Sequence, residues 1–343
     1  MPSKPANRFG ADPRSIALGM LVLYVVWGST YLAIALAVET IPPFLMAGAR
    51  FLLAGVVLLG WVLARHGSSA LRTGRREWRD SLIVGALLLG GGMGMVAFGE
   101  QTIPSGITAL IIGLMPVWVA VFGRAFLGER LPGLAIVGIV VGFVGVGILV
   151  GPTLTGGTGA LDPLGLVAII ISPISWSIGS LYASHRAVLP REPLVSTGLQ
   201  MTLGGLVLLT MSMLAGEPAR FDPAAVSTTS IAGFLYLAVV GSLLAFTAYG
   251  WLLRVAPLPL IATYAYVNPV VAVILGAIVL QEPIDVRTLV AGAVIIGAVA
   301  LIVTARGRMS APRRPVPATA PVSPPPAPSA RPAGPAPSRS ASD

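Results

Sequence analysis

The 343-residue sequence contains no cysteine and only two histidines, and this scarcity excludes several kinds of site. Without cysteine the chain has no disulfide, no thiolate-bound zinc and no thiol nucleophile. His66 and His185 are far apart in the sequence and stand alone, so they form no set of imidazole ligands. We therefore expect neither a metal ion nor another cofactor.

Charged residues are also scarce, at 10% of the chain, whereas hydrophobic residues make up 55%. Most charges lie between long uncharged runs, and runs of about twenty apolar residues match a hydrocarbon layer roughly 30 Å thick. The runs do not alternate apolar and polar residues as barrel strands do, so the backbone must satisfy itself as helices. The sequence therefore predicts an all-α integral membrane protein that lies in a lipid bilayer.

Ten membrane-spanning helices are predicted from these runs. The expected spans are 15–36, 42–64, 81–99, 104–127, 132–150, 161–184, 194–215, 230–253, 258–280 and 285–305. They define four regions: a short N-terminal segment 1–14, a first five-helix repeat 15–150, a second five-helix repeat 161–305, and a tail 306–343 rich in Pro, Ala and Ser. The tail cannot bury enough apolar surface to fold and is predicted to be disordered.

Two copies of one unit are visible in the residue spacing. At an offset of 153, Pro104, Pro116 and Glu129 match Pro257, Pro269 and Glu282. At an offset of 150, Pro43, Gly48, Leu53, Gly55 and Val57 match Pro193, Gly198, Leu203, Gly205 and Val207. Because five spans is an odd number, the second copy enters the membrane in the opposite orientation. Such inverted repeats are typical of transporters whose substrate site lies between the copies.

The net charge of +9 follows membrane topology. Nineteen Lys and Arg residues fall in segments on the side of the N-terminus, two fall on the other side, and Arg50 lies within a span. This bias predicts that both termini are cytoplasmic. Arginine greatly outnumbers lysine, and Ala, Gly and Pro are abundant, which fits a bacterium with a GC-rich genome. No nucleic-acid partner is expected. The arginines of the tail either have no role or rest on anionic lipid headgroups.

Arg50 is the charge predicted deepest within a span. It follows Pro43 by seven residues, which places it roughly 10 Å along the helix. A charge at that depth costs roughly 2.5–3.5 kcal/mol on insertion scales, so it requires a partner or water. Glu100, at the end of the third span, is the nearest candidate. The two alternatives are a structural Arg50–Glu100 pair and an Arg50 that contacts a solute or a gate.

Aromatic and amide side chains in mid-span form a second group of candidates. Trp27 and Trp176 lie in the middle of the first helix of each repeat, although tryptophan usually collects at membrane interfaces. They either line a cavity or fill space between helices. Tyr264 and Asn268 share a helix face. Asn268 also precedes Pro269, which deletes a backbone hydrogen bond, and polar residues beside such a defect favour a cavity.

Prolines and glutamates near span ends have structural interpretations. Pro116 is the counterpart of Pro269, and both are expected to act as hinges or kinks. Glu129 and Glu282 resemble proton-coupling carboxylates, but we expect each to anchor the N-terminus of the next helix. The glycines of span 132–150 permit close helix packing, with a homodimer contact as the alternative. No phosphate-binding loop is present, so ATP hydrolysis is not expected.

Several motifs, in order along the chain, resemble those of the drug/metabolite transporter superfamily, in particular its ten-helix EamA-type permeases. They are Trp27-Gly28-Ser29-Thr30-Tyr31, Arg50-Phe51, Pro104-Ser105-Gly106 and Tyr264-Ala265-Tyr266-Val267-Asn268-Pro269-Val270, followed by Glu282. The resemblance covers about 15–305. It implies a plasma-membrane permease, often an exporter of amino acids, related metabolites or drugs. It also implies a central cavity between the repeats that opens to alternating sides.

We therefore predict a secondary transporter, not an enzyme, that exports a small amphipathic metabolite such as a neutral or aromatic amino acid. The expected cavity residues are Trp27, Tyr31, Arg50, Glu100, Trp176, Tyr264 and Asn268. Two other classes stay open. A non-transporting receptor or scaffold would depend on the tail, and an intramembrane enzyme acting on a lipid-linked substrate would show clustered acids or histidines at one interface.

Overall fold

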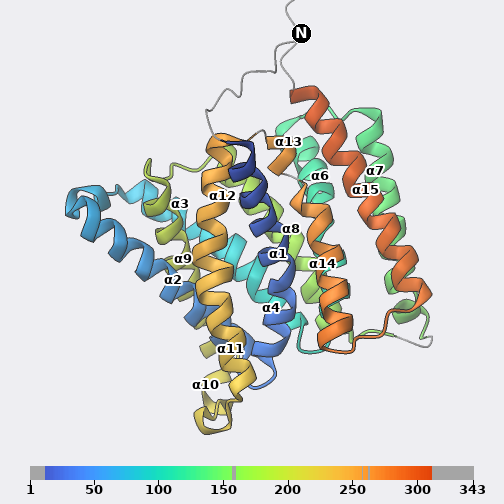
Figure 1. Ribbon diagram of the computed structural model, residues 1–343, viewed down its shortest axis with the longest axis horizontal. Coiled ribbons are helices and arrows are strands. Elements are labelled where there is room, and N and C mark those ends of the chain that lie inside the picture. Colours follow the sequence, from blue (N-terminus) through green and yellow to red (C-terminus); the bar gives the residue numbers. More distant parts are fainter. Residues whose placement is uncertain (1–11, 157–159, 257, 262, 311–343) are drawn as a thin grey trace, which may run out of the picture. The chain divides into compact units, whose positions relative to one another are not determined.

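The computed structural model describes residues 12–156, 160–256, 258–261 and 263–310, and all regular structure within these ranges is helical (Figure 1). Nine helical segments in this part of the chain are long and apolar enough to cross a membrane. A tenth, Tyr264–Val279, is shorter but also apolar. Together they follow the ten predicted spans in order.

The elements of the first repeat are α1 (Pro13–Val38), α2 (Pro43–His66), η1 (Ser68–Leu71), α3 (Arg75–Gly85), η2 (Ala86–Gly94), α4 (Met95–Gly99), α5 (Ser105–Ile112), α6 (Met115–Leu127) and α7 (Gly133–Thr155). The elements of the second repeat are α8 (Pro163–His185), α9 (Pro193–Leu214), α10 (Glu217–Arg220), η3 (Pro223–Ala225), α11 (Thr228–Tyr236), η4 (Leu237–Leu244), α12 (Ala245–Val255), α13 (Leu258–Ile261), α14 (Tyr264–Val279) and α15 (Val286–Ser310).

The ends of the chain differ in how far the structure describes them. Residues 1–11 of the predicted N-terminal segment lie outside the described residues, and α1 begins at Pro13. At the other end α15 continues to Ser310, beyond the predicted start of the disordered tail at residue 306. The remainder of that predicted tail, residues 311–343, lies outside the described residues.

Prolines begin the first two helices of each repeat. Pro13 and Pro43 start α1 and α2, and Pro163 and Pro193 start α8 and α9, each 150 residues later. Proline suits the first turn because its missing N–H has no intrahelical partner there. The equivalent starts put equivalent residues at the same level of each helix.

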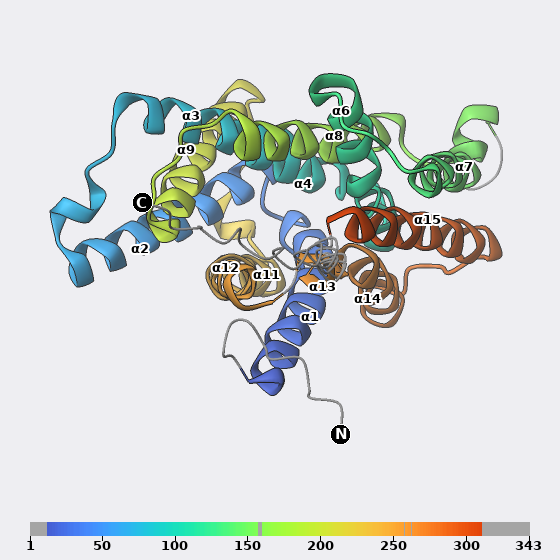
Figure 2. The ribbon, with the colours of Figure 1, turned by 90° about the horizontal axis from the view of Figure 1, so that it is seen from above.

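The contact between α2 and α9 reveals the inverted symmetry of the repeats (Figure 2). A Cβ atom added to Gly55 would lie 2.8 Å from the carbonyl oxygen of Gly198, and one added to Gly205 would lie 3.0 Å from that of Gly48. Gly48 corresponds to Gly198, and Gly55 to Gly205. The two helices therefore cross in antiparallel directions through reciprocal glycine pairs, as expected when one copy is upside down.

Each repeat also contains a π-helical stretch in its third span. η2 joins α3 to α4, and η4 joins α11 to α12 at the equivalent place, beginning 151 residues later. π-Helical turns are frequent at functional sites. In η2 a Cβ at Gly92 would lie 2.9 Å from the Trp176 ring, so the glycine run allows α8 to pack closely on η2. Ser175 reinforces this contact by donating to the carbonyl of Leu87 at 2.8 Å.

Two spans predicted as continuous helices are interrupted. The expected helix over 104–127 breaks at Gly113 and Leu114, which separate α5 from α6. After the break α6 begins at Met115, and Pro116 stands in its first turn, where a missing N–H costs little. The expected helix over 258–280 is divided into α13 and α14, and Pro269 lies inside α14. A Cβ at Gly113 would approach the Pro269 ring to 2.9 Å, so the two irregular regions pack together.

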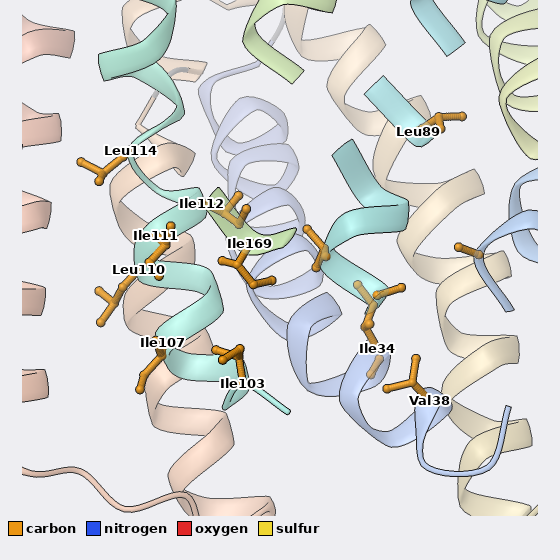
Figure 3. Packing of buried hydrophobic residues seen from close by; sticks show 14 of the residues in the cluster. Ile34, Val38, Leu89, Ile103, Ile107, Leu110, Ile111, Ile112, Leu114 and Ile169 are labelled. Atoms are coloured by element: carbon orange, nitrogen blue, oxygen red, sulfur yellow. The ribbon is translucent and has the colours of Figure 1, made fainter. Parts of the chain in front are cut away.

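The apolar core is centred on α5, all of whose residues are buried. Figure 3 shows Ile107, Leu110 and Ile111 projecting from α5 into this packing. By contrast, the outer face of α7 carries large exposed apolar side chains, including Val140, as expected of a surface against lipid. The predicted glycine face of α7 packs within the chain, since a Cβ at Gly138 would lie 3.0 Å from the carbonyl oxygen of Ala298 in α15.

Candidate functional site

A cavity lies between the two repeats and is lined by both. It encloses about 700 Å³ of empty space, counted with its opening. Its lining residues from the first repeat are Trp27, Thr30, Tyr31, Arg50, Phe51, Met93, Val96, Ile112 and Met115. Those from the second repeat are Ser172, Pro173, Trp176, Gly241, Tyr264 and Asn268.

Six of the seven predicted cavity residues line this cavity, and Glu100 is the one that does not. Trp27 and Tyr31 reach it together because they are four residues apart on one face of α1. Arg50 comes from α2, Trp176 from α8, and Asn268 from α14. The cavity therefore collects its polar and aromatic groups from four helices.

One wall of the cavity is an aromatic cluster. The Trp27 ring lies 5.0 Å from that of Tyr264 and 5.2 Å from that of Tyr249, measured between ring centroids. Such tilted and edge-to-face pairs are favourable for aromatic rings and present a broad apolar surface. Tyr249 of α12 was not among the predicted residues. It packs on Trp27 but is not itself among the residues that line the cavity.

Arg50 is almost completely buried, with 2% of its surface exposed. Its Nε donates a hydrogen bond to Ser242 Oγ at 3.1 Å, and its guanidinium carbon lies 4.4 Å from the centroid of the Phe51 ring. Ser242 belongs to η4, so the π-helical stretch of the second repeat holds the cation of the first. Sequence reasoning missed Ser242 because it is 192 residues from Arg50.

The Arg50–Glu100 pair suggested by the sequence is not formed. The two ion pairs among the described residues involve other groups, Arg79 with Asp80 and Arg287 with Asp285. The physical reason is direction: Arg50 turns toward η4, whereas Glu100 ends α4 outside the cavity lining. No acidic residue lines the cavity in the part of the chain that the structure describes.

Asn268 contributes a free acceptor. Its side chain is buried, at 7% exposure, and its Oδ1 accepts no hydrogen bond from any described residue. It is brought close to α1 by Gly28, since a Cβ there would lie 2.6 Å from the Cβ of Val271 and 3.3 Å from the Asn268 carbonyl oxygen. A buried acceptor without a protein partner is uncommon and is available to a bound molecule.

Glu282 does not anchor the helix that follows it. Its carboxylate accepts from the backbone N–H groups of Ser105, at 2.6 Å, and Gly106, at 3.0 Å, and so caps the N-terminus of α5 in the other repeat. The following helix, α15, is capped instead by Asp285, which accepts from the Thr288 N–H at 2.7 Å. The described residues hold no cluster of three or more His, Cys, Asp or Glu side chains that could bind a metal ion.

Comparison with known proteins gives concordant matches along the chain. The model of the EamA-like transporter family matches residues 14–151 and 163–304. YedA of Escherichia coli (strain K12), named an uncharacterized inner membrane transporter, is 39% identical over 304 residues, which cover 87% of this chain and 93% of YedA. Protein PecM of Dickeya dadantii (strain 3937) is 31% identical over 288 residues, which cover 81% of this chain and 88% of PecM. A known crystal structure, 22% identical, matches 87% of this chain and 100% of its own with a TM-score of 0.57, a likeness of fold.

Proposed function

This chain belongs to the EamA-like transporter family and is a membrane transporter, and we propose that it exports a small amphipathic metabolite, such as a neutral or aromatic amino acid, through the cavity between its repeats. The E. coli relative is named an inner membrane transporter, and the apolar helices fit a multi-pass protein of the bacterial inner membrane. The excess of Lys and Arg on one side supports an orientation with both termini in the cytoplasm.

The observation that carries the proposal is the chemistry of the cavity lining. It combines aromatic surface, one buried cation and one free amide acceptor, and it includes no acidic side chain among the described residues. The aromatic wall suits the apolar part of a solute. The Arg50 guanidinium suits a carboxylate, which it can bind through two parallel hydrogen bonds. Asn268 Oδ1 suits an ammonium or another donor.

Alternating access is supported by the irregular helices beside the cavity. Met115 and Ile112 line it on either side of the α5–α6 break, and Tyr264 and Asn268 line it from the start of α14, directly after the α13–α14 break. Interrupted helices at the repeat interface are typical of transporters whose two halves rock about a central site. Pro116 and Pro269 are the proposed hinge residues.

Counterflow tests the proposal most directly. Purified, monodisperse protein is reconstituted in liposomes loaded with unlabelled amino acid, and entry of the same labelled amino acid is measured across a panel. Transient accumulation above that of protein-free liposomes is expected for neutral or aromatic members. Silence across the whole panel, from protein that remains folded, would contradict the amino-acid assignment and direct the search to nucleosides, sugars and drugs.

A further inference from the structure

Glu100 lies one helical turn beyond the cavity. Its backbone N–H donates to the carbonyl of Val96 at 2.9 Å, and Val96 lines the cavity. Residues four apart share a helix face, so Glu100 continues the cavity-facing side of α4 toward its end, about 5 Å farther along the axis. On α5, Thr108 stands in the same relation to Ile112, another lining residue.

The Glu100 carboxyl group is buried without a partner. Only 7% of its surface is exposed, and neither of its oxygens accepts or donates a hydrogen bond among the described residues. The hydroxyls of Thr108 and Ser105 are likewise buried without partners in this part of the chain. Burying an ionised carboxylate in such a place costs far more than burying its neutral, protonated form.

The charges around Glu100 also favour a bound proton. Its electrostatic neighbours are Glu282 and, on α1, Tyr31. Glu282 accepts hydrogen bonds from the two backbone N–H groups at the start of α5. Burial of Glu100 and the electrostatic influence of the nearby Glu282 carboxyl group both disfavour the ionised form of Glu100, so this group favours a bound proton.

Among the described residues, the remaining helices that pack on α4 bring no cation to Glu100. On α2, Arg50 is held by Ser242. At the start of α8, Asp162 is occupied by the Gly165 N–H at 2.7 Å and the Thr102 hydroxyl at 3.2 Å. Neither of the ion pairs among the described residues includes Glu100. A proton is therefore the simplest ion that neutralises this site.

We propose that Glu100 is the proton-binding site of this transporter and that it couples export of the solute to entry of a proton. This inference rests on the proposed function. In the proposed orientation Glu100 lies toward the outer side, where its carboxylate takes a proton from the external water. After the cavity reorients, the same proton leaves to the cytoplasm, and no other bond changes. Tyr31 faces both the cavity and Glu100, so a solute in the cavity and a proton on Glu100 influence one another.

Infrared spectroscopy tests the site without any solute. Purified parent protein at neutral pH is expected to show the carbonyl stretching band of a protonated carboxylic acid, and Glu100→Gln is expected to lack it. Glu39→Gln is the matched control, because Glu39 is an exposed carboxylate at the end of α1 and its removal should leave the band unchanged. A parent spectrum without this band, or a band that survives in Glu100→Gln, would overturn the proposal.

Gradient-driven flux tests the coupling, with labelled phenylalanine as the probe. Liposomes containing the parent are expected to expel phenylalanine against its gradient when the external medium is made more acidic, up to about tenfold for about one pH unit with one proton per cycle. Glu100→Gln should keep counterflow but lose this response, whereas Glu39→Gln should keep both.

The outcomes separate the two proposals. Parent counterflow that ignores the pH gradient, or that follows an imposed sodium gradient instead, would overturn proton coupling and leave the transport function standing. Absence of phenylalanine counterflow from the parent counts against the proposed solute class, and the infrared band then decides the proton site alone. If Glu100→Gln does not fold, coupling is tested in the parent alone. Phenylalanine-dependent proton flux, followed with an internal pH dye, is then expected, and its absence would overturn proton coupling.

Discussion

Arg50 and Gln200 occupy equivalent positions in α2 and α9, 150 residues apart, yet they do different things. Arg50 reaches across to Ser242 of the other repeat and lines the cavity. Gln200 donates to Ser196, one turn back in its own helix, at 2.8 Å, and lies outside the lining. The duplicated backbone thus sets where the helices run. A single residue in one copy gives the cavity its charge, so the site is asymmetric although the frame is not.

The glycine crossing of α2 and α9 is the shared frame, and breaking it should have the largest effect. Gly55→Val places a Cβ 2.6 Å from the Thr202 backbone nitrogen, and Gly205→Val places one 2.6 Å from that of Leu52. Overpacking against backbone costs about 1–3 kcal/mol or more, so both variants should lose most monodisperse protein on size-exclusion chromatography.

Gly60→Val is the control for this crossing, because a Cβ there meets nothing within 4 Å. It should behave like the parent in yield and melting temperature. A Gly205→Val protein as stable as the parent, beside an unstable Gly55→Val protein, would show that the two halves do not share the crossing equally.

Arg50 tests the asymmetry itself. Arg50→Gln keeps a donor of similar length but removes the charge, and a hydrogen bond to a charged group contributes about 1.5–3 kcal/mol. Counterflow of a carboxylate-bearing solute should therefore fall by about 10- to 150-fold, measured as the initial rate per folded protein. Gln200→Ala, at the equivalent position, should change this rate less than about twofold. Equal losses at the two positions would contradict the assignment of Arg50 to the solute.

Much of this arrangement could be predicted because it depends on features that one stretch of sequence carries. Apolar runs determine the spans, and the offsets of 150 and 153 determine the repeats. The depth of Arg50 and the mid-span position of Trp176 follow from counting along a helix. These quantities are local, so the sequence alone was sufficient to gather most of the cavity residues into one group.

Direction around the helix axis and contacts between repeats could not be predicted in the same way. The sequence places Glu100 at the end of the third span, but it does not say that Arg50 turns toward Ser242 in η4. Nor does it show that Glu282 caps α5, since that contact joins residues 177 apart. The break at Gly113 also escaped, because proline in a first helical turn and proline inside a helix have the same local sequence signal.

The two central tryptophans should separate packing from binding. Trp27 packs on Tyr249 and Tyr264, and each such aromatic contact contributes about 0.5–1.5 kcal/mol beyond burial. Trp27→Ala should therefore lower the melting temperature as well as transport. Trp176→Ala should mainly raise the half-saturating solute concentration, by about three- to tenfold. Thermal melting measured with and without solute distinguishes the two, and equal melting temperatures would contradict the difference.

The smallest expected effect concerns the last helix of each repeat. α7 begins after Pro132 with no side-chain cap, whereas Asp285, the equivalent residue before α15, accepts from Thr288. Hydrogen bonds from the side chain and backbone of Thr288 lower the pKa of Asp285. Asp285→Ala should cost about 0.5–1 kcal/mol, at the lower end for a cap because this side chain is half exposed.

The pH dependence of that cap follows from the lowered pKa. Its stabilisation is fully present above the unfolded-state pKa of about 3.9 and is lost as the pH falls through the folded-state value. Asp285→Asn keeps an acceptor oxygen for Thr288 but cannot titrate, so its stability relative to the parent should improve as the medium becomes acidic. Thermal melting of both proteins in detergent between neutral and acidic pH measures this difference. A difference in melting temperature between the two proteins that stays constant with pH would mean that the charge of Asp285 does not contribute to the cap. The helices α7 and α15 would then differ in capping but not in their response to acid.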